Sequence, residues 1–145
     1  MFSEALGRLV NVSYPANADY ISLRDAAGIT FVGYEVDGAT VFTITFSSDN
    51  AGTATSTPAV LDHYYGSSLD QSNGKWHKTA VSPASNTFTA ADVTEDLVVI
   101  EVPATSAPDG YPWVKCTADG AGIVFAITHD LKYQRTPANL RSILA

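Results

Sequence analysis

The sequence predicts an all-β domain, either a β-sandwich or a jelly-roll-like fold, with extended or short helical terminal arms. From residue 20 onward, short runs of β-branched and aromatic residues recur about every 8–12 residues, which is typical of sandwich strands. Gly, Pro, Asn and Asp turn signals separate these runs, and no helical pattern stands between them. The run 41–47 alternates strictly between apolar and hydroxyl-bearing side chains, as a half-buried strand does.

Seven to nine strands follow from this pattern. The run 97–102 (LVVIEV) is nearly all apolar, which fits a fully buried sandwich strand. Residues 48–58 lack apolar periodicity and favour a long loop, and residues 86–93 are ambiguous. The turns that contain Asp25–Gly28, Asp37–Gly38, Asn73–Gly74 and Asp119–Gly120 are expected to close hairpins. The expected strands are 20–24, 29–34, 41–47, 59–65, 75–81, 97–102, 111–117 and 122–128.

The 145 residues fit one domain, with an N-terminal arm at 1–18, a β-sandwich at 19–133 and a C-terminal arm at 134–145. Residues 2–10 space their apolar side chains at helical intervals, which gives a short amphipathic helix or an apolar arm. Such termini either fold back on their own domain or cover a neighbouring subunit. The candidate subunit contacts are Phe2, Leu6, Leu9, Tyr133, Arg135, Pro137, Leu140, Ile143 and Leu144.

The composition favours protein partners. Charged residues make up 16% of the chain, against about 25% in a typical soluble domain, and the cores of subunit contacts are depleted in charge. The net charge is −7 and the eight basic residues are scattered, so nucleic acid is not an expected partner. The chain has neither an apolar run of about 20 residues nor a signal-peptide pattern, so we expect no membrane contact and synthesis in the cytoplasm.

The residues that usually carry chemistry show no catalytic or metal-binding spacing. His63, His77 and His129 form no HxH or HExxH pattern and are expected to be surface or strand-end histidines, so no metal is expected. The single Cys116 excludes an intrachain disulfide and is expected to be a small core residue. Without GxSxG or a phosphate-binding loop, the sequence predicts no enzyme, no catalytic residue and no cofactor.

Two weaker patterns leave alternatives open. The acids Glu95–Asp96, and Asp49 with Asp62, would suit a glycosidase only if they faced one another across a cleft, and their turn-like context favours solvated loop acids. Tyr111 and Trp113 lie two residues apart on one strand face, so they either pack in the core or offer a stacking surface for sugar, as Trp76 could. A carbohydrate-binding module is therefore the alternative from another functional class.

Two stretches resemble segments of small virion proteins of tailed bacteriophages that are encoded close to the major capsid protein. These are DYISLRDAAGITFV (19–32) and DGYPWVKCTADGAGIVFAITHDLKYQRTPANL (109–140). The second ends in a pattern made by Leu131, Tyr133, Arg135, Pro137, Asn139 and Leu140.

The resemblance implies a minor capsid, cement or head-decoration protein. Such a protein would bind the major capsid protein on the outside of the shell, stabilise the head, and associate with copies of itself, with a trimer favoured. It would be located in the virion, assembled in the host cytoplasm, and would have no catalytic residues. The nearest structural alternative is a tail-terminator or tail-tube component.

Overall fold

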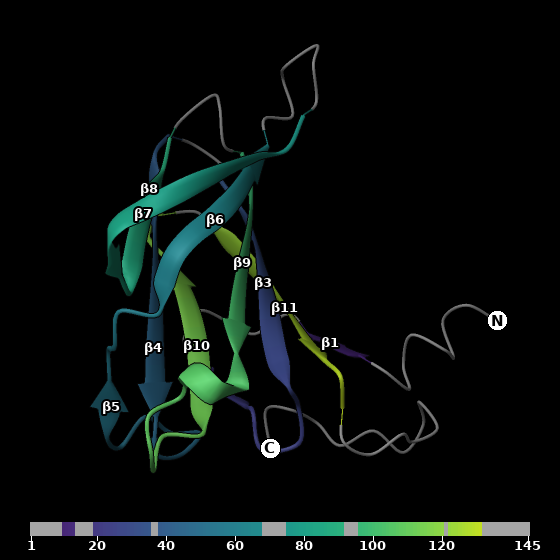
Figure 1. The fold of residues 1–145 in the computed structure, drawn as a ribbon, viewed down its shortest axis with the longest axis vertical. Helices are drawn as coiled ribbons and strands as arrows, with labels where there is room; N and C mark the ends of the chain where they lie inside the picture. The colour runs from purple at the N-terminus through teal and green to yellow at the C-terminus, as the bar shows by residue number, and fades with distance from the viewer. Residues whose placement is uncertain are drawn as a thin grey trace, which may run out of the picture.

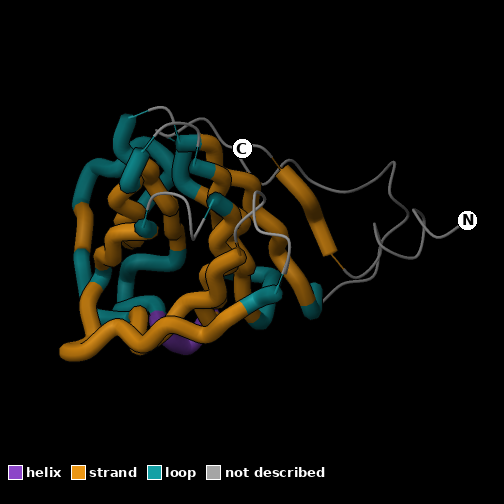
Figure 2. Tube along the Cα trace, turned by 90° about the horizontal axis from the view of Figure 1, so that it is seen from above, coloured by secondary structure: helices purple, strands orange, loops and turns teal. Residues whose placement is uncertain are grey.

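The computed structural model describes residues 10–13, 19–35, 38–67, 75–91, 96–120 and 122–131. Within these ranges the chain is all-β: strands form two antiparallel sheets, and one short 3-10 helix spans Ala104–Ser106. The sheets lie as two layers around a common core (Figures 1 and 2). The predicted all-β sandwich is confirmed. No helix in the described part is long and apolar enough to span a bilayer.

The larger sheet has six strands, and neighbouring strands are antiparallel throughout. β1 lies within the segment expected as an N-terminal arm and adds an edge strand beside β11. In spatial order the strands are β1 (Val10–Ser13), β11 (Ile123–His129), β3 (Gly28–Tyr34), β9 (Leu97–Pro103), β6 (Leu61–Ser67) and β7 (His77–Ser85).

The smaller sheet has five strands, with β4 (Thr40–Ser47) pairing with three of the others. The segment 48–58, expected to be a loop, contains the two-residue strand β5, and the ambiguous segment 86–93 contains β8. The remaining members are β2 (Ile21–Ser22), β10 (Trp113–Ala118), β5 (Thr55–Ser56) and β8 (Thr87–Ala90).

Three of the expected hairpins are wrong, because their strands lie in different sheets. In each of these pairs (β2 and β3, β3 and β4, β10 and β11), one strand lies in the larger sheet and the other in the smaller sheet. The turn between the two strands therefore passes from one sheet to the other. Gly38 (φ 85°) and Gly120 (φ 62°) do adopt the left-handed conformation that their turns require. Such a turn reverses the chain whether or not the flanking strands pair. The expected pairing across 68–74 is confirmed, since β6 and β7 are antiparallel neighbours.

Specific hydrogen bonds hold these crossings in place. The Val41 amide donates to the Asp119 carboxylate at 2.6 Å, and the Asp119 amide donates to the Val41 carbonyl at 3.0 Å, which ties the β10–β11 turn to β4. At the β7–β8 crossing, the Ile44 amide donates to the Asn86 carbonyl (2.8 Å) and the Asn86 side-chain amide donates to the Ile44 carbonyl (3.3 Å). Each crossing therefore satisfies backbone groups that would otherwise be left at the edge of the core.

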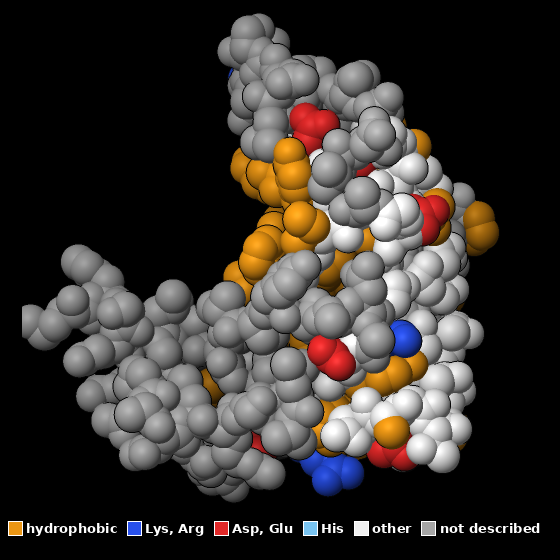
Figure 3. Space-filling model, turned by 180° about the vertical axis from the view of Figure 1, so that it is seen from behind, with side chains coloured by type: hydrophobic (Ala, Val, Ile, Leu, Met, Phe, Trp, Pro, Cys, Tyr) orange, Lys and Arg blue, Asp and Glu red, His pale blue; other side chains and the backbone are white. Residues whose placement is uncertain are grey.

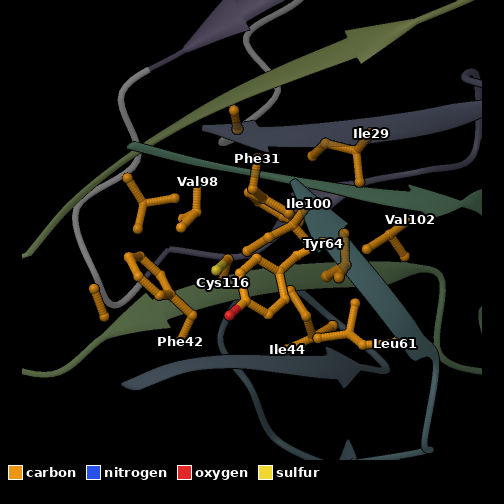
Figure 4. Packing of buried hydrophobic residues seen from close by; sticks show 14 of the residues in the cluster. Ile29, Phe31, Phe42, Ile44, Leu61, Tyr64, Val98, Ile100, Val102 and Cys116 are labelled. Atoms are coloured by element: carbon orange, nitrogen blue, oxygen red, sulfur yellow. The ribbon is translucent and has the colours of Figure 1, made fainter. Parts of the chain in front are cut away.

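Aromatic side chains connect the two layers in the core (Figure 4). Phe88 of β8 stacks on Tyr64 of β6, with ring centroids 4.0 Å apart, and on Phe42 of β4 at 5.4 Å. Phe42 packs directly over Gly33 of β3, where no side chain intervenes. The largest fully buried side chains are Phe31, Phe42, Phe46, Ile21, Ile29, Ile44, Leu61, Ile100, Val98, Val102, Val114 and Val124.

Candidate functional site

The outer face of the six-stranded sheet carries a continuous set of apolar side chains. Phe125, Val32, Val99 and Tyr65 are in register across four neighbouring strands and form one row. The next row, from Ile123 through Tyr34 to Leu97, is also apolar. Phe125 is 44% exposed, and its apolar neighbours on this face are half-buried. We call the following residues the apolar face: Val32, Tyr34, Tyr65, Leu97, Val99, Ile123, Phe125 and Ile127.

Charged and polar groups border the apolar face. Lys78 lies opposite Tyr65, on the edge strand β7. On the other side of the Phe125–Val99 row, Ile127 of the apolar face lies opposite Thr30, and Thr30 lies opposite Glu101. Seen from behind, hydrophobic side chains gather along one side of the described part of the molecule (Figure 3). The arrangement, an apolar centre with polar groups at its border, is the one that subunit contacts show.

The sequence contained a signal for this face. In β9, Val98, Ile100 and Val102 are buried, but Leu97 and Val99 point to the outer surface. The apolar run predicted a strand buried on both sides, and only one of its sides lies in the core. Apolar residues at successive positions of an antiparallel strand thus place apolar side chains on its outer side as well as in the core. The apolar run of β11 can be interpreted in the same way.

The outer face of the five-stranded sheet has the opposite character. Thr43 of β4 lies opposite Thr87 on one side and Thr117 on the other. Next to this row, Thr45 lies opposite Lys115, whose ammonium group sits 4.6 Å from the centre of the Tyr20 ring. An antiparallel sheet with one face in the core normally presents such a polar face to water. The apolar face of the larger sheet is the exception.

Histidine–carboxylate pairs occur between chain neighbours. His63 Nδ1 lies 2.5 Å from Asp62 Oδ1, and His129 Nδ1 lies 3.2 Å from Asp130 Oδ2. The hydrogen bond from His63 lowers the pKa of the exposed Asp62 carboxyl. His77 is exposed at the start of β7. Across the described ranges, no group of three or more His, Cys, Asp or Glu side chains could hold a metal ion.

Cys116 and Asp49 serve the fold locally. The Cys116 thiol is buried in β10 beside Ile44, and desolvation raises its pKa well above the ordinary range, which confirms the predicted core position. The Asp49 carboxylate accepts hydrogen bonds from the amides of Thr53 (3.0 Å) and Ala51 (3.1 Å). The bond from the Thr53 amide is the main cause of its lowered pKa. Both amides belong to the same loop as Asp49, so the carboxylate stabilises the turn of that loop.

The aromatic residues considered for sugar stacking lie in different settings. Tyr111 packs against the hydrophobic core, and Trp113 is half-buried at the start of β10. Trp76 is 52% exposed and directly precedes β7. The ring best placed to meet a ligand from solvent is therefore Trp76.

The contact residues expected from the sequence lie outside the described residues. These are Phe2, Leu6, Leu9, Tyr133, Arg135, Pro137, Leu140, Ile143 and Leu144. The prediction that they bind other subunits therefore stays a prediction. The apolar face is a candidate contact surface, and none of its residues is among those expected from the sequence.

Comparison of the chain with protein-family models, with curated proteins and with solved structures finds no match.

Proposed function

We propose that this chain is a structural protein, not an enzyme, and that it works by binding other protein subunits. The observation that carries the proposal is the apolar face, which spans four neighbouring strands on the outside of the sandwich. Water in contact with such a surface is unfavourable, and contiguous apolar patches on soluble proteins are commonly sites of protein contact. The low content of charged residues, 16%, supports the same function.

The more specific proposal is a decoration, cement or minor capsid protein on the outside of a tailed-phage head. The resemblance of 19–32 and 109–140 to small phage virion proteins supports it. The partners would be the major capsid protein and further copies of this chain, in virions assembled in the host cytoplasm. Many copies bound to one shell would stabilise it jointly, because each contact raises the effective concentration for the next.

Quantitative mass spectrometry of purified particles tests this role. A head-decoration protein should be present at a copy number that matches repeated positions on the shell. A chain that is absent from particles contradicts a virion role. A chain present at only a few copies contradicts the cement role and favours the alternative, a tail-terminator or tail-tube component.

A carbohydrate-binding module is the candidate from another functional class, and the exposed Trp76 ring is the observation that favours it. Glycan-array binding tests this alternative. Binding that disappears in Trp76→Ala, with the thermal transition unchanged, would support a sugar site. The matched control is Trp113→Ala, which removes an indole from the other sheet. Without any glycan signal, the alternative is abandoned.

A further inference from the structure

We propose that the apolar face binds the same face of a second copy, so that two six-stranded sheets pack against each other around a two-fold axis. This inference rests on the proposed function, because it takes the apolar face to be a protein-contact surface. It adds which partner covers that surface and how. The contact is separate from the terminal residues that the sequence suggested.

The size of the sheet fits a subunit interface. Six strands spaced about 4.8 Å apart span about 24 Å, and a seven-residue strand such as β3 is about 23 Å long. The projected area is therefore about 550 Å², and the accessible area of a face covered by side chains is larger than its projection. A standard protein interface buries about 800 Å² on each partner. The apolar face covers four of these strands, so it would form the centre of such an interface, and the polar positions around it would form the border.

The shape and chemistry of the face suit another sheet. Val32, Val99 and Ile123 are β-branched side chains that stand out from neighbouring strands as short ridges. Two sheets pack face to face about 10 Å apart when such side chains interdigitate. The apolar face of a second copy has the same arrangement of side chains and the same apolar character. A two-fold contact needs only this one surface, because the patch is used by both partners.

A contact centred on the rows of Phe125 and Ile123 would leave the nearby charges away from its centre, with Glu101 in the adjoining row that contains Ile127. Lys78 stands on the edge strand β7, and Glu101 lies in the row beyond Val99, beside Thr30. Burying an unpaired charge costs several kcal/mol, so a charge at the centre would oppose association. The hydroxyl-rich face of the other sheet, with Thr43, Thr117 and Lys115, lacks an apolar centre and should stay in contact with water.

Sedimentation velocity of the full-length chain over a wide concentration range, with a matched pair of variants, tests the proposal. Val99→Lys places a charge at the centre of the apolar face, and Thr43→Lys makes the same charge change on the outer face of the other sheet. Both positions are half-buried in central strands. Val32→Thr is a milder second variant, because threonine retains the β-branched shape and strand preference.

The wild type and Thr43→Lys are expected to reach twice the 15.3 kDa chain mass. Val99→Lys should stay monomeric or dissociate about tenfold or more readily, with Val32→Thr weakened in the same direction. A monomeric wild type at every concentration overturns the inference and points to coverage of the face by the chain's own termini. A trimer, or a dimer that Val99→Lys and Val32→Thr leave intact, also overturns it.

The two proposals fail in different ways. If the chain is monomeric in solution but mass spectrometry finds it in particles at a copy number that matches the shell, the virion role is supported and the self-contact is contradicted. If the chain forms a dimer that Val99→Lys weakens but is absent from particles, the self-contact is supported and the virion role is contradicted.

Discussion

At the scale of single residues, Cys116 shows how the sandwich controls reactivity. Its thiol lies in the core next to Ile44, and desolvation raises its pKa, so the reactive thiolate is suppressed at neutral and mildly alkaline pH. We expect the native protein at pH 8 to react with a thiol reagent such as DTNB only as fast as it unfolds. The reaction should become immediate in denaturant. Rapid labelling of the native protein would show that the thiol is accessible.

At Gly33 the ring of Phe42 from the other sheet packs directly against the backbone of β3. A Cβ atom added there would lie 2.7 Å from Val98 Cγ2 and would also collide with the Phe42 ring. Gly33→Ala is therefore expected to lower the free energy of unfolding by about 1–3 kcal/mol, the usual range for overpacking a core. Thr30→Ala, on the outer face of the same strand, is the control and should cost less. Equal melting temperatures for wild type and Gly33→Ala would contradict this packing.

Asp49 makes stability depend on pH through its loop. The amides of Thr53 and Ala51 donate to its carboxylate and hold its pKa below the ordinary value. Because the folded-state pKa is lowered, the stabilisation is present above the unfolded pKa, about pH 4, and is lost as the pH falls through the folded value. Asp49→Ala should therefore melt below the wild type at pH 7, and the difference should shrink in acid.

The control for this pH series is Asp25→Ala, which removes an equal charge from another exposed turn. A difference between Asp49→Ala and wild type that stays constant from pH 7 to below pH 3 would contradict the role of the ionised carboxylate.

At the scale of strands, the sequence indicated most elements, and it failed on which strands pair. Alternation identified 41–47 and the apolar run identified 97–102, which the structure contains as β4 and β9. A turn such as Asp119–Gly120 specifies a chain reversal through local backbone preference. Which strand then becomes the neighbour depends on core packing and on bonds such as those between Asp119 and Val41, which are 78 positions apart. Such partners cannot be identified from local patterns.

The last described strand gives a prediction about the C-terminal segment. β11 ends at His129 and pairs with β3 on one side and β1 on the other. Removing residues 134–145 should therefore leave a folded sandwich with a cooperative thermal transition. A control chain that ends at Gly122 lacks β11 and should not fold. Loss of the transition in the first truncation would show that 134–145 belongs to the core.

At the scale of the whole molecule, the two outer faces of the sandwich differ in character. The five-stranded sheet presents threonine and lysine, and the six-stranded sheet presents the apolar face. The sequence pattern favoured subunit contacts at the terminal residues, and the apolar run 97–102 favoured a strand buried on both sides. The sequence shows that single strands such as β9 carry apolar side chains on both sides, but strand order decides which of these positions become neighbours. Once the order is known, the rows follow from the register.

The most direct test of this account is hydroxyl-radical footprinting of the full-length protein across a dilution series. Phe125, on the apolar face, is expected to be labelled in dilute solution and protected as the concentration rises. Trp113, on the other sheet, is the internal reference and should be labelled equally throughout. Labelling of Phe125 that is the same at every concentration would contradict the claim that two copies of the chain meet at this face.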